Sequence, residues 1–339
     1  MKTSVAFLAA FLFWGVGFSG QVGAAKQTFL LDWIIYGKHA PFFVAQDKGF
    51  FKKVGLDVDF KRGFGSGDTI RKVGAKAALL GFADASTLVN ARANSDVPVK
   101  EVAIIHAKSL EIVGFLKEKG YKTPKDLVGQ RYGNPPTNRC CFPALAGANG
   151  FPPDSIKEVG MEIGSLVPSL LAGKVDFIAL FATELPTLRA KAASIGKEVG
   201  AFYFADWGVD AYNNGVVVHE DSIRSNPQFV RNAVRAVVDA WAWSIVNVDE
   251  TVKNFLKYAP GMSEPLIRGH LAIAVNHLFD EGVRRHGLGY MDHQKMDATV
   301  DMLTKYQGLK KRIRAEDMYT NRFLPQWPAI KAALGDKAR

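Results

Sequence analysis

A structural unit that occurs twice restricts the possible folds of this 339-residue chain more than any other feature of its sequence. The first copy reads as a strand over 56–61, a turn over 63–68, a helix over 69–76 and a strand over 78–83. The second reads as a strand over 159–163, a Gly-Ser turn at 164–165, a helix over 166–171 and a strand over 175–180. Strand–helix–strand order is typical of parallel sheets with crossover helices. The repeat therefore predicts an α/β protein with two similar parallel-sheet lobes.

The glycine and serine residues of both copies indicate a ligand cleft between the lobes. In open parallel sheets, ligands bind beyond the carboxyl ends of the strands, where helix N-termini present free N–H groups. Glycine lets the backbone approach a ligand closely, and serine adds a hydroxyl group. Two lobes that face one another would form a hinged clamp for a small polar or anionic solute. Ordinary turn chemistry is the alternative explanation for each Gly-Ser pair taken singly.

The remaining patterns predict the lobe boundaries. A strand at 28–31, a helix at 41–51 closed by Gly49 and a strand at 55–60 begin the first lobe. Asn226 and Pro227 start a helix with an apolar stripe, and amphipathic segments follow at 265–278 and 293–306. Chain crossings are expected around 116–123 and 206–216. The expected first lobe comprises residues 26–119 and 213–330, the second lobe 120–212 and the C-terminal tail 331–339.

The first 25 residues have the pattern of a signal peptide. Lys2 precedes an apolar stretch from Val5 to Phe18, and small residues at 23–25 predict cleavage after Ala25. The apolar stretch is shorter than the roughly 20 residues that span a bilayer. No cysteine follows it as a site for lipid attachment. We therefore expect an exported, periplasmic protein that is free in its compartment.

Composition and motifs argue against several classes of function. The net charge is +10, but the sequence has no interleaved basic and aromatic groove and no nucleic-acid-binding motif, so no nucleic-acid partner is expected. It has no nucleophile elbow, no His-Glu-x-x-His and no phosphate-binding loop, so no catalytic residue and no cofactor is predicted. The two cysteines, Cys140 and Cys141, are adjacent, and we expect buried thiols rather than a strained ring.

Candidate ligand-binding residues lie at the predicted strand ends. Aromatic side chains there can stack on a flat solute, with Trp33 the first choice; they are Trp33, Tyr36, Phe64, Phe181, Trp207 and Tyr212. The polar candidates are His39, Ser66, Gly67, Asp68, Ser86, Asn138, Ser165 and Glu184. Core packing is the alternative role for Phe64 and Phe181. Helix capping is the alternative for Asp68 and Glu184, and a purely structural place in the loop is the alternative for His39.

Three segments resemble the ABC-transporter binding proteins of the nitrate, sulfonate and taurine type. Residues 31–58 are similar to the family's opening, with Asp32-Trp33 at a strand end, His39 in the loop, a helix ending in Gly49 and a Gly-Leu-x-Val strand. Residues 123–129 and 171–176 resemble the start of the second lobe and its repeat. The resemblance implies a bilobal, type II periplasmic-binding-protein fold with a hinged cleft. It also implies a monomer that delivers a small-molecule solute to an ABC permease in the inner membrane.

Within that group, the chain resembles the branch of thiamine-pyrimidine precursor binders and synthases. Pyrimidine binders carry Asp-Trp-x-Pro-Asn-x-Asn-His, of which Trp33 and His39 are present here and both asparagines are absent. A small aromatic or heterocyclic solute, such as a vitamin precursor, is the leading hypothesis. An alkyl sulfonate, taurine or nitrate anion is the alternative, favoured by the positive charge. A synthase-like enzyme is the second alternative, but residues 139–143 keep only a fragment of the synthases' cysteine motif, so neither catalysis nor a metal is predicted.

Overall fold

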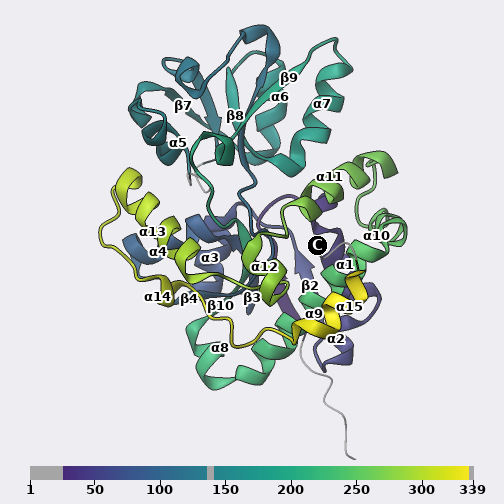
Figure 1. Cartoon of the computed structure of the whole chain (residues 1–339). Helices are drawn as coiled ribbons and strands as arrows, with labels where there is room; N and C mark the ends of the chain where they lie inside the picture. Colours follow the sequence, from purple (N-terminus) through teal and green to yellow (C-terminus); the bar gives the residue numbers. More distant parts are fainter. Residues whose placement is uncertain (1–25, 136–140, 336–339) are drawn as a thin grey trace, which may run out of the picture.

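The computed structural model describes residues 26–135 and 141–335. The predicted signal peptide, Asn138 and Cys140 lie outside these residues, whereas Cys141 is buried. Figure 1 shows two bodies, each a sheet with helices on its faces, the second above the first. We call the body that contains the N-terminal strand the first lobe and the other body the second lobe. Across residues 26–135 and 141–335, no helix has the length and apolar character needed to cross a membrane.

The sheet of the first lobe has the strand order β2-β1-β3-β10-β4. Strands β1 and β2 are parallel, as are β1 and β3, whereas β10 runs antiparallel to both of its neighbours. The strands are β1 (Gln27–Leu30), β2 (Val58–Lys61), β3 (Leu80–Asp84), β4 (Val99–Ile104) and β10 (Asn214–His219).

The sheet of the second lobe repeats this arrangement in the order β7-β6-β8-β5-β9. Strands β6, β7 and β8 are parallel, and β5 runs antiparallel to β8 and β9. Both sheets are therefore mixed, and the prediction of parallel sheets was wrong in this respect. The reason is that β5 and β10 each follow a crossing between the lobes, so they start at the cleft edge where the parallel strands end. The strands are β5 (Glu111–Leu116), β6 (Arg131–Asn134), β7 (Lys157–Gly160), β8 (Phe177–Phe181) and β9 (Val199–Tyr203).

Helices cover both sheets, and most of them belong to the first lobe (Figure 1). The second lobe carries α5 (Phe142–Ala148), α6 (Leu166–Leu171) and α7 (Leu185–Ala193). The first lobe carries α1 (Ala40–Asp47), α2 (Phe50–Lys53), α3 (Ser66–Gly74), α4 (Ala85–Ser95), α8 (Glu220–Ser225), α9 (Pro227–Val246), α10 (Val248–Phe255), α11 (Glu264–Asn276), α12 (Glu281–His286), α13 (His293–Gln307), α14 (Ala315–Met318) and α15 (Trp327–Leu334).

Local sequence signals explain where two of these helices begin and end. Asn226 caps α9, because its Oδ1 accepts the Phe229 N–H at 3.2 Å, and the predicted apolar stripe of α9 is buried. The helix predicted over 41–51 is broken instead into α1 and α2. Gly49 adopts a left-handed conformation, with φ of 70°, between them. Glycine tolerates this conformation because it has no Cβ, so the chain turns before α2 begins.

The chain crosses between the lobes earlier than the sequence predicts. It leaves the first sheet after Ile104, and β5, which the expected boundaries placed in the first lobe, already belongs to the second sheet. The return crossing ends at Asn214. The two crossing segments lie side by side: the Asn214 carbonyl accepts N–H groups from Ile105 and His106, both at 2.9 Å, and the Asn213 N–H donates back to the His106 carbonyl at 3.0 Å.

Gly63 and Gly164, which lie in corresponding turns of the two lobes, are expected to tolerate alanine to very different degrees. A Cβ on Gly63 would lie 1.9 Å from the Leu31 carbonyl oxygen, whereas a Cβ on Gly164 would meet nothing within 4 Å. Neither glycine has a positive φ. Gly63→Ala should therefore lower the free energy of unfolding by about 1–3 kcal/mol, and Gly164→Ala should change it by less than about 0.5 kcal/mol. Urea denaturation checks both, and equal losses would contradict the steric explanation.

Candidate functional site

The loop that follows β1 contacts the end of β8 where the two lobes meet. Trp33 Nε1 donates a hydrogen bond to Glu184 Oε1 at 2.9 Å. The Trp33 ring lies edge-on to Phe181, with 5.6 Å between the ring centroids. The hydroxyl groups of Tyr36 and Thr183 are 2.7 Å apart. We call these residues, together with Lys38, the interlobe group: Trp33, Tyr36, Lys38, Phe181, Thr183 and Glu184.

The first-lobe loop is held in shape by a buried ionic cluster around Asp32. Its carboxylate accepts hydrogen bonds from Lys38 Nζ at 2.6 Å, His39 Nε2 at 2.9 Å and Asn214 Nδ2 at 3.1 Å. Burial alone would raise the pKa of Asp32, but the Lys38 ammonium and the His39 hydrogen bond hold it well below its usual value. Burial lowers the pKa of His39, so its ring is neutral. His39 therefore positions the loop through Asp32.

Lys38 extends from this cluster to the second lobe. Its side chain is fully buried, and Nζ lies 3.9 Å from the centroid of the Phe181 ring. A cation over an aromatic face at this distance is attracted by the negative charge of the ring face, more strongly when water is excluded. The same ammonium is paired with Asp32. Lys38 thus joins the loop of one lobe to an aromatic side chain of the other without adding net charge to the site.

Glu184 is the acid of the interlobe group. Its Oε2 accepts the Phe181 N–H at 3.1 Å, and its Oε1 accepts the Trp33 indole N–H. Burial raises the pKa of Glu184 to about 7, against the opposing effect of these two hydrogen bonds. Burial and the charge of Glu184 also raise the pKa of Tyr36 well above its usual value, so Tyr36 is a neutral phenol. The site therefore offers a carboxyl group that can either donate or accept a proton near neutral pH.

The raised pKa of Glu184 predicts that the free energy of unfolding falls as the pH rises. Glu184→Gln should make this fall smaller. The folded state favours the protonated carboxyl, so its contribution is fully present below the unfolded pKa of 4.5 and is lost as the pH rises through about 7. Urea midpoints of both proteins at these two pH values measure the effect. Asp84 and Glu101, whose pKa values are also raised by burial, remain in both proteins as a common background. An equal fall in the stability of Glu184→Gln between the two pH values would show that Glu184 is not its cause.

A second contact between the lobes lies beside the interlobe group, at α11. His270 Nδ1 accepts the Gly37 N–H at 3.3 Å, and His270 Nε2 lies 2.7 Å from Thr187 Oγ1 in α7. Burial lowers the pKa of His270 to about 4, so the ring is neutral. Because Nδ1 accepts a hydrogen bond, Nε2 carries the proton and donates it to Thr187. In Figure 1, α11 is the first-lobe helix that reaches up to the second lobe beside α7.

The predicted polar residues of the first-lobe repeat lie around the start of α3 and α4. Ser66 Oγ accepts the Asp84 N–H at 3.1 Å, which ties the start of α3 to the end of β3. Asp68 pairs with Arg71 and Lys72 on its own helix. Gly67 is half-buried beside them. Ser86 is buried, and its hydroxyl has no hydrogen-bond partner among the described residues.

Four further predicted residues lie outside the interlobe group. Phe64 is 47% exposed, between Arg62 and Lys72, and Ser165 is exposed. Trp207 packs on Phe202 within the second lobe, at 5.6 Å between ring centroids. The Tyr212 hydroxyl accepts the Asp292 N–H at 2.7 Å, so this residue fastens the return crossing to the first lobe. The structure thus brings together Trp33, Tyr36, His39, Phe181 and Glu184 from the predicted set.

Sequence reasoning missed four residues that hold this site together: Asp32, Lys38, Thr183 and His270. A lysine between Tyr36 and His39 in an aromatic loop, six residues after an aspartate, was the available signal for the ion pair. Nothing in the sequence marked Thr183 or His270. The part of the chain that the structure describes has no group of three or more His, Cys, Asp or Glu side chains placed to hold a metal ion.

The two mixed sheets, the double crossing and the contact between the lobes define the class: a type II periplasmic-binding-protein fold, as the sequence predicted. The alkanesulfonate-binding protein SsuA from Xanthomonas axonopodis pv. citri, solved with MOPS bound, superimposes with a TM-score of 0.69 at 13% identity, covering 87% of this chain and 98% of that chain. The family described as NMT1/THI5 like matches residues 37–251, and the chain belongs to this family. The predicted family resemblance is confirmed.

Related sequences within the family include binding proteins and enzymes. The formylaminopyrimidine-binding protein of Halalkalibacterium halodurans is 25% identical over 86% of this chain and 88% of its own length. The riboflavin-binding protein RibY of Chloroflexus aurantiacus is 26% identical over 91% of this chain and 88% of its own length. The 4-amino-5-hydroxymethyl-2-methylpyrimidine phosphate synthase THI13 of Saccharomyces cerevisiae is a more distant relative, 24% identical over 71% of this chain and 73% of its own length. Of these three relatives, the two that cover the larger shares of this chain, 86% and 91%, are named as binding proteins.

Proposed function

We propose that this protein is the extracytoplasmic receptor of an ABC importer and binds a small aromatic or heterocyclic solute between its lobes. The observation that carries the proposal is the direct contact of Trp33 of the first lobe with Phe181 and Glu184 of the second. An aromatic pair supplies stacking surface, and a carboxyl with a pKa near 7 supplies both hydrogen-bond roles that ring nitrogens and amino groups require. The names of two relatives, which bind formylaminopyrimidine and riboflavin, support a flat heterocycle.

Binding would use the contacts that now join the two lobes. When the lobes separate, the hydrogen bond between the Trp33 indole N–H and the Glu184 carboxyl breaks, and both groups become accessible to a solute between the lobes. A flat solute with a donor and an acceptor satisfies both groups and stacks on the rings that they carry. The lobes then close on the solute through bending at residues 105–110 and 209–213, which we propose as the hinge. Each lobe contributes at least one contact, so the solute favours the closed form.

Transport and location follow from this role. We propose that residues 1–25 direct export, that cleavage follows Ala25 and that the protein works as a monomer in the periplasm with an inner-membrane permease. Binding rather than synthesis is supported by the two binding-protein relatives, which cover 86% and 91% of this chain, against 71% for the synthase THI13. The anion alternative ranks second, because the one cation of the interlobe group, Lys38, is already neutralised by Asp32 at 2.6 Å.

Isothermal titration calorimetry of the full exported chain tests the proposal. The panel contains formylaminopyrimidine, riboflavin and other flat heterocycles, with an alkanesulfonate, taurine and nitrate as the competing class. We expect a heterocycle to bind, and urea denaturation at 100 times its dissociation constant should then show a stabilisation of about 2.7 kcal/mol. Binding of only the sulfonates, taurine or nitrate would overturn the proposal in favour of an anion receptor. Absence of binding by every member would overturn both.

A further inference from the structure

One lysine of the first lobe contacts both of the segments that connect the lobes. We call residues 105–110 the outgoing crossing and residues 209–213 the return crossing. Lys295 lies in the first turn of α13, and its Nζ donates to the Ala107 carbonyl of the outgoing crossing at 2.7 Å. The same Nζ lies 3.5 Å from Asp210 Oδ2 of the return crossing. One ammonium group therefore links the two crossings.

Two aspartates that begin neighbouring helices hold Lys295 in the first lobe. Asp292 caps α13, because its Oδ1 accepts the Lys295 N–H at 3.1 Å, and its own N–H donates to the Tyr212 hydroxyl at 2.7 Å. Asp280 caps α12, and its Oδ2 lies 3.5 Å from Lys295 Nζ. The centroid of the Tyr212 ring lies 5.0 Å from the same Nζ. The Lys295 side chain is 19% exposed, so water screens these contacts less than it screens a surface ion pair.

Hydrogen bonds show where the outgoing crossing leaves the first lobe. The Lys108 N–H donates to the His277 carbonyl at the end of α11, at 3.2 Å. Two residues later, the Leu110 carbonyl accepts the Ala182 N–H of the second lobe at 2.7 Å. Lys108 is thus fixed to the first lobe and Leu110 to the second. Ser109 is the residue between them.

The return crossing changes lobes at a matching point. The Val209 N–H donates at 2.9 Å to the carbonyl of Phe204, which follows β9 in the second lobe. The next residue, Asp210, is paired with Lys295 of the first lobe. Between the two crossings, the Ser109 N–H donates to Asp210 Oδ1 at 3.4 Å. The two points at which the chain changes lobes are therefore adjacent in space.

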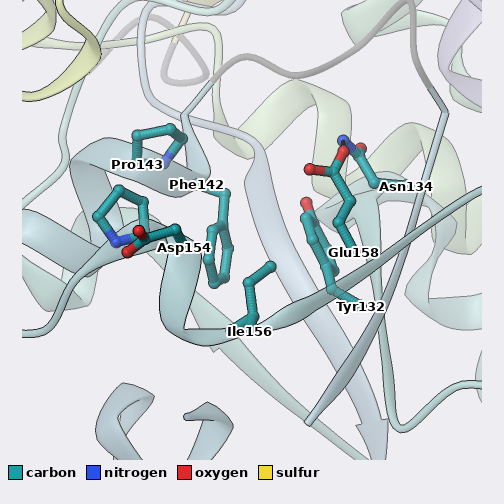
Figure 2. A pocket seen from close by; sticks show the side chains of 8 residues that line it. Tyr132, Asn134, Phe142, Pro143, Asp154, Ile156 and Glu158 are labelled. Atoms are coloured by element: carbon teal, nitrogen blue, oxygen red, sulfur yellow. Dashed lines mark hydrogen bonds between the residues drawn. The ribbon is translucent and has the colours of Figure 1, made fainter. Parts of the chain in front are cut away.

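The second lobe is held together by contacts of its own beyond these points. Tyr132 of β6 is stacked on Phe142 of α5, with 4.7 Å between the ring centroids and 28° between the ring planes. Figure 2 shows both rings in the wall of a second-lobe pocket. Tyr132 is stacked in turn on Phe177 of β8, at 4.7 Å and 15°. Two strands and a helix are thus joined through close-packed rings, which favours movement of the second lobe as one body.

We propose that Lys295 is a clasp that keeps both crossings attached to the first lobe. Bending is then restricted to the backbone at Ser109 and at the junction of Val209 and Asp210. This inference rests on the proposed function, which requires the lobes to open, and it narrows the proposed hinge to these two points. Two adjacent bending points define one axis of rotation. The second lobe turns about that axis, and the rest of both crossings moves with the first lobe.

Removal of the ammonium group should release both crossings at once. The carboxylates of Asp210 and Asp280 would lose the cation that both contact, and their like charges repel. The carbonyl of Ala107, a buried residue, would lose this donor. The hydrogen bonds that pair the crossings, such as that from the Asn213 N–H to the His106 carbonyl, would then open more often.

Hydrogen exchange of the full exported chain, measured without solute by mass spectrometry of proteolytic fragments, tests the clasp. In Lys295→Met, the fragments that contain both crossings should exchange at least about tenfold faster than in the natural protein. Fragments of β6 and β8 in the second lobe and of α9 in the first are references that should stay unchanged. The matched control is Lys305→Met, an exposed lysine of the same helix whose ammonium lies 4.8 Å from the Tyr306 ring centroid. It should leave both crossings unchanged.

Three outcomes would overturn the clasp: no acceleration at either crossing, acceleration at one crossing only, or equal acceleration in the reference fragments, which would mean a general loss of stability. If Lys295→Met does not fold, Lys295→Gln, which removes the charge but keeps a polar group, takes its place with the same expected result. Failure of the heterocycle panel would count against the proposed function and leave this test unaffected, because no solute is present in it.

Discussion

Asp32→Asn is expected to destabilise the protein by about 3–5 kcal/mol, since it leaves the buried Lys38 ammonium without its countercharge. Both side chains are fully buried, and Nζ lies 2.6 Å from Asp32 Oδ2. Among the described residues, the other hydrogen-bond acceptor of the ammonium is Asn214 Oδ1, at 3.4 Å. Neither this amide nor the Phe181 ring carries the full charge that the carboxylate supplied. Urea denaturation followed by circular dichroism measures the loss.

The double variant Asp32→Asn with Lys38→Met is the matched control for this prediction. It removes the ammonium and keeps an aliphatic side chain of similar length beside the Phe181 ring. We expect the double variant to recover at least half of the loss, because the cost in the single variant is that of an unpaired buried charge. A single variant that loses less than about 1 kcal/mol would place this pair among the weak, solvent-screened ion pairs. A double variant as unstable as the single one would assign the loss to packing instead.

Trp33→Ala is expected to weaken binding of the heterocyclic solute by at least about 2 kcal/mol, which is roughly a 30-fold rise in the dissociation constant. The substitution removes the ring that meets Phe181 and the N–H that Glu184 accepts. Trp33→Phe should lose less, because it keeps a stacking surface and removes only the hydrogen bond. Calorimetry with the heterocycle identified in the panel measures all three proteins.

Trp207→Ala provides the comparison for a tryptophan outside the interlobe group. Trp207 was predicted to line the site but packs on Phe202 inside the second lobe. Its removal should lower the stability of that lobe and leave the affinity for the heterocycle within about threefold of the natural protein, since no contact to solute is lost. If Trp207→Ala weakened binding as strongly as Trp33→Ala, or if Trp33→Ala had no effect on affinity, the solute would lie elsewhere than at the interlobe group.

The repeated unit was predictable because local patterns determine it. The turns at 63–68 and 164–165 lie where strands give way to helices, as expected, and the helices and strands after them follow within a few residues. The direction of β5 and β10 was not predictable in the same way. Both are short strands that are buried throughout, so their sequences show no alternation of buried and exposed residues that identifies a partner strand or its direction. The choice depends on where the chain crosses between the lobes.

The candidate site was predictable in part, for a related reason. Trp33 and Glu184 were found because an aromatic at a strand end and an acid at a helix start are local signals. Trp207 and Tyr212 carry signals of the same kind, but Trp207 packs on Phe202 of the second lobe and Tyr212 fastens the return crossing to the first lobe. Lys38 was missed because lysine is usually exposed, and only the folded chain brings Asp32 next to its ammonium. Local sequence signals identify residues whose side chains could contact a ligand. The packing of the two lobes determines which of these residues contact one another.

Asn214 performs two tasks at one position, and this constrains how the molecule can move. Its backbone carbonyl accepts from Ile105 and His106 of the outgoing crossing, while its side chain contacts Asp32 and Lys38. A rotation of one lobe against the other therefore pulls on the same residue that orients the Trp33 loop. Because the two crossing segments are hydrogen-bonded to one another, they would bend together rather than independently. Each closing movement would then bring the Trp33 ring back to the same position against Phe181.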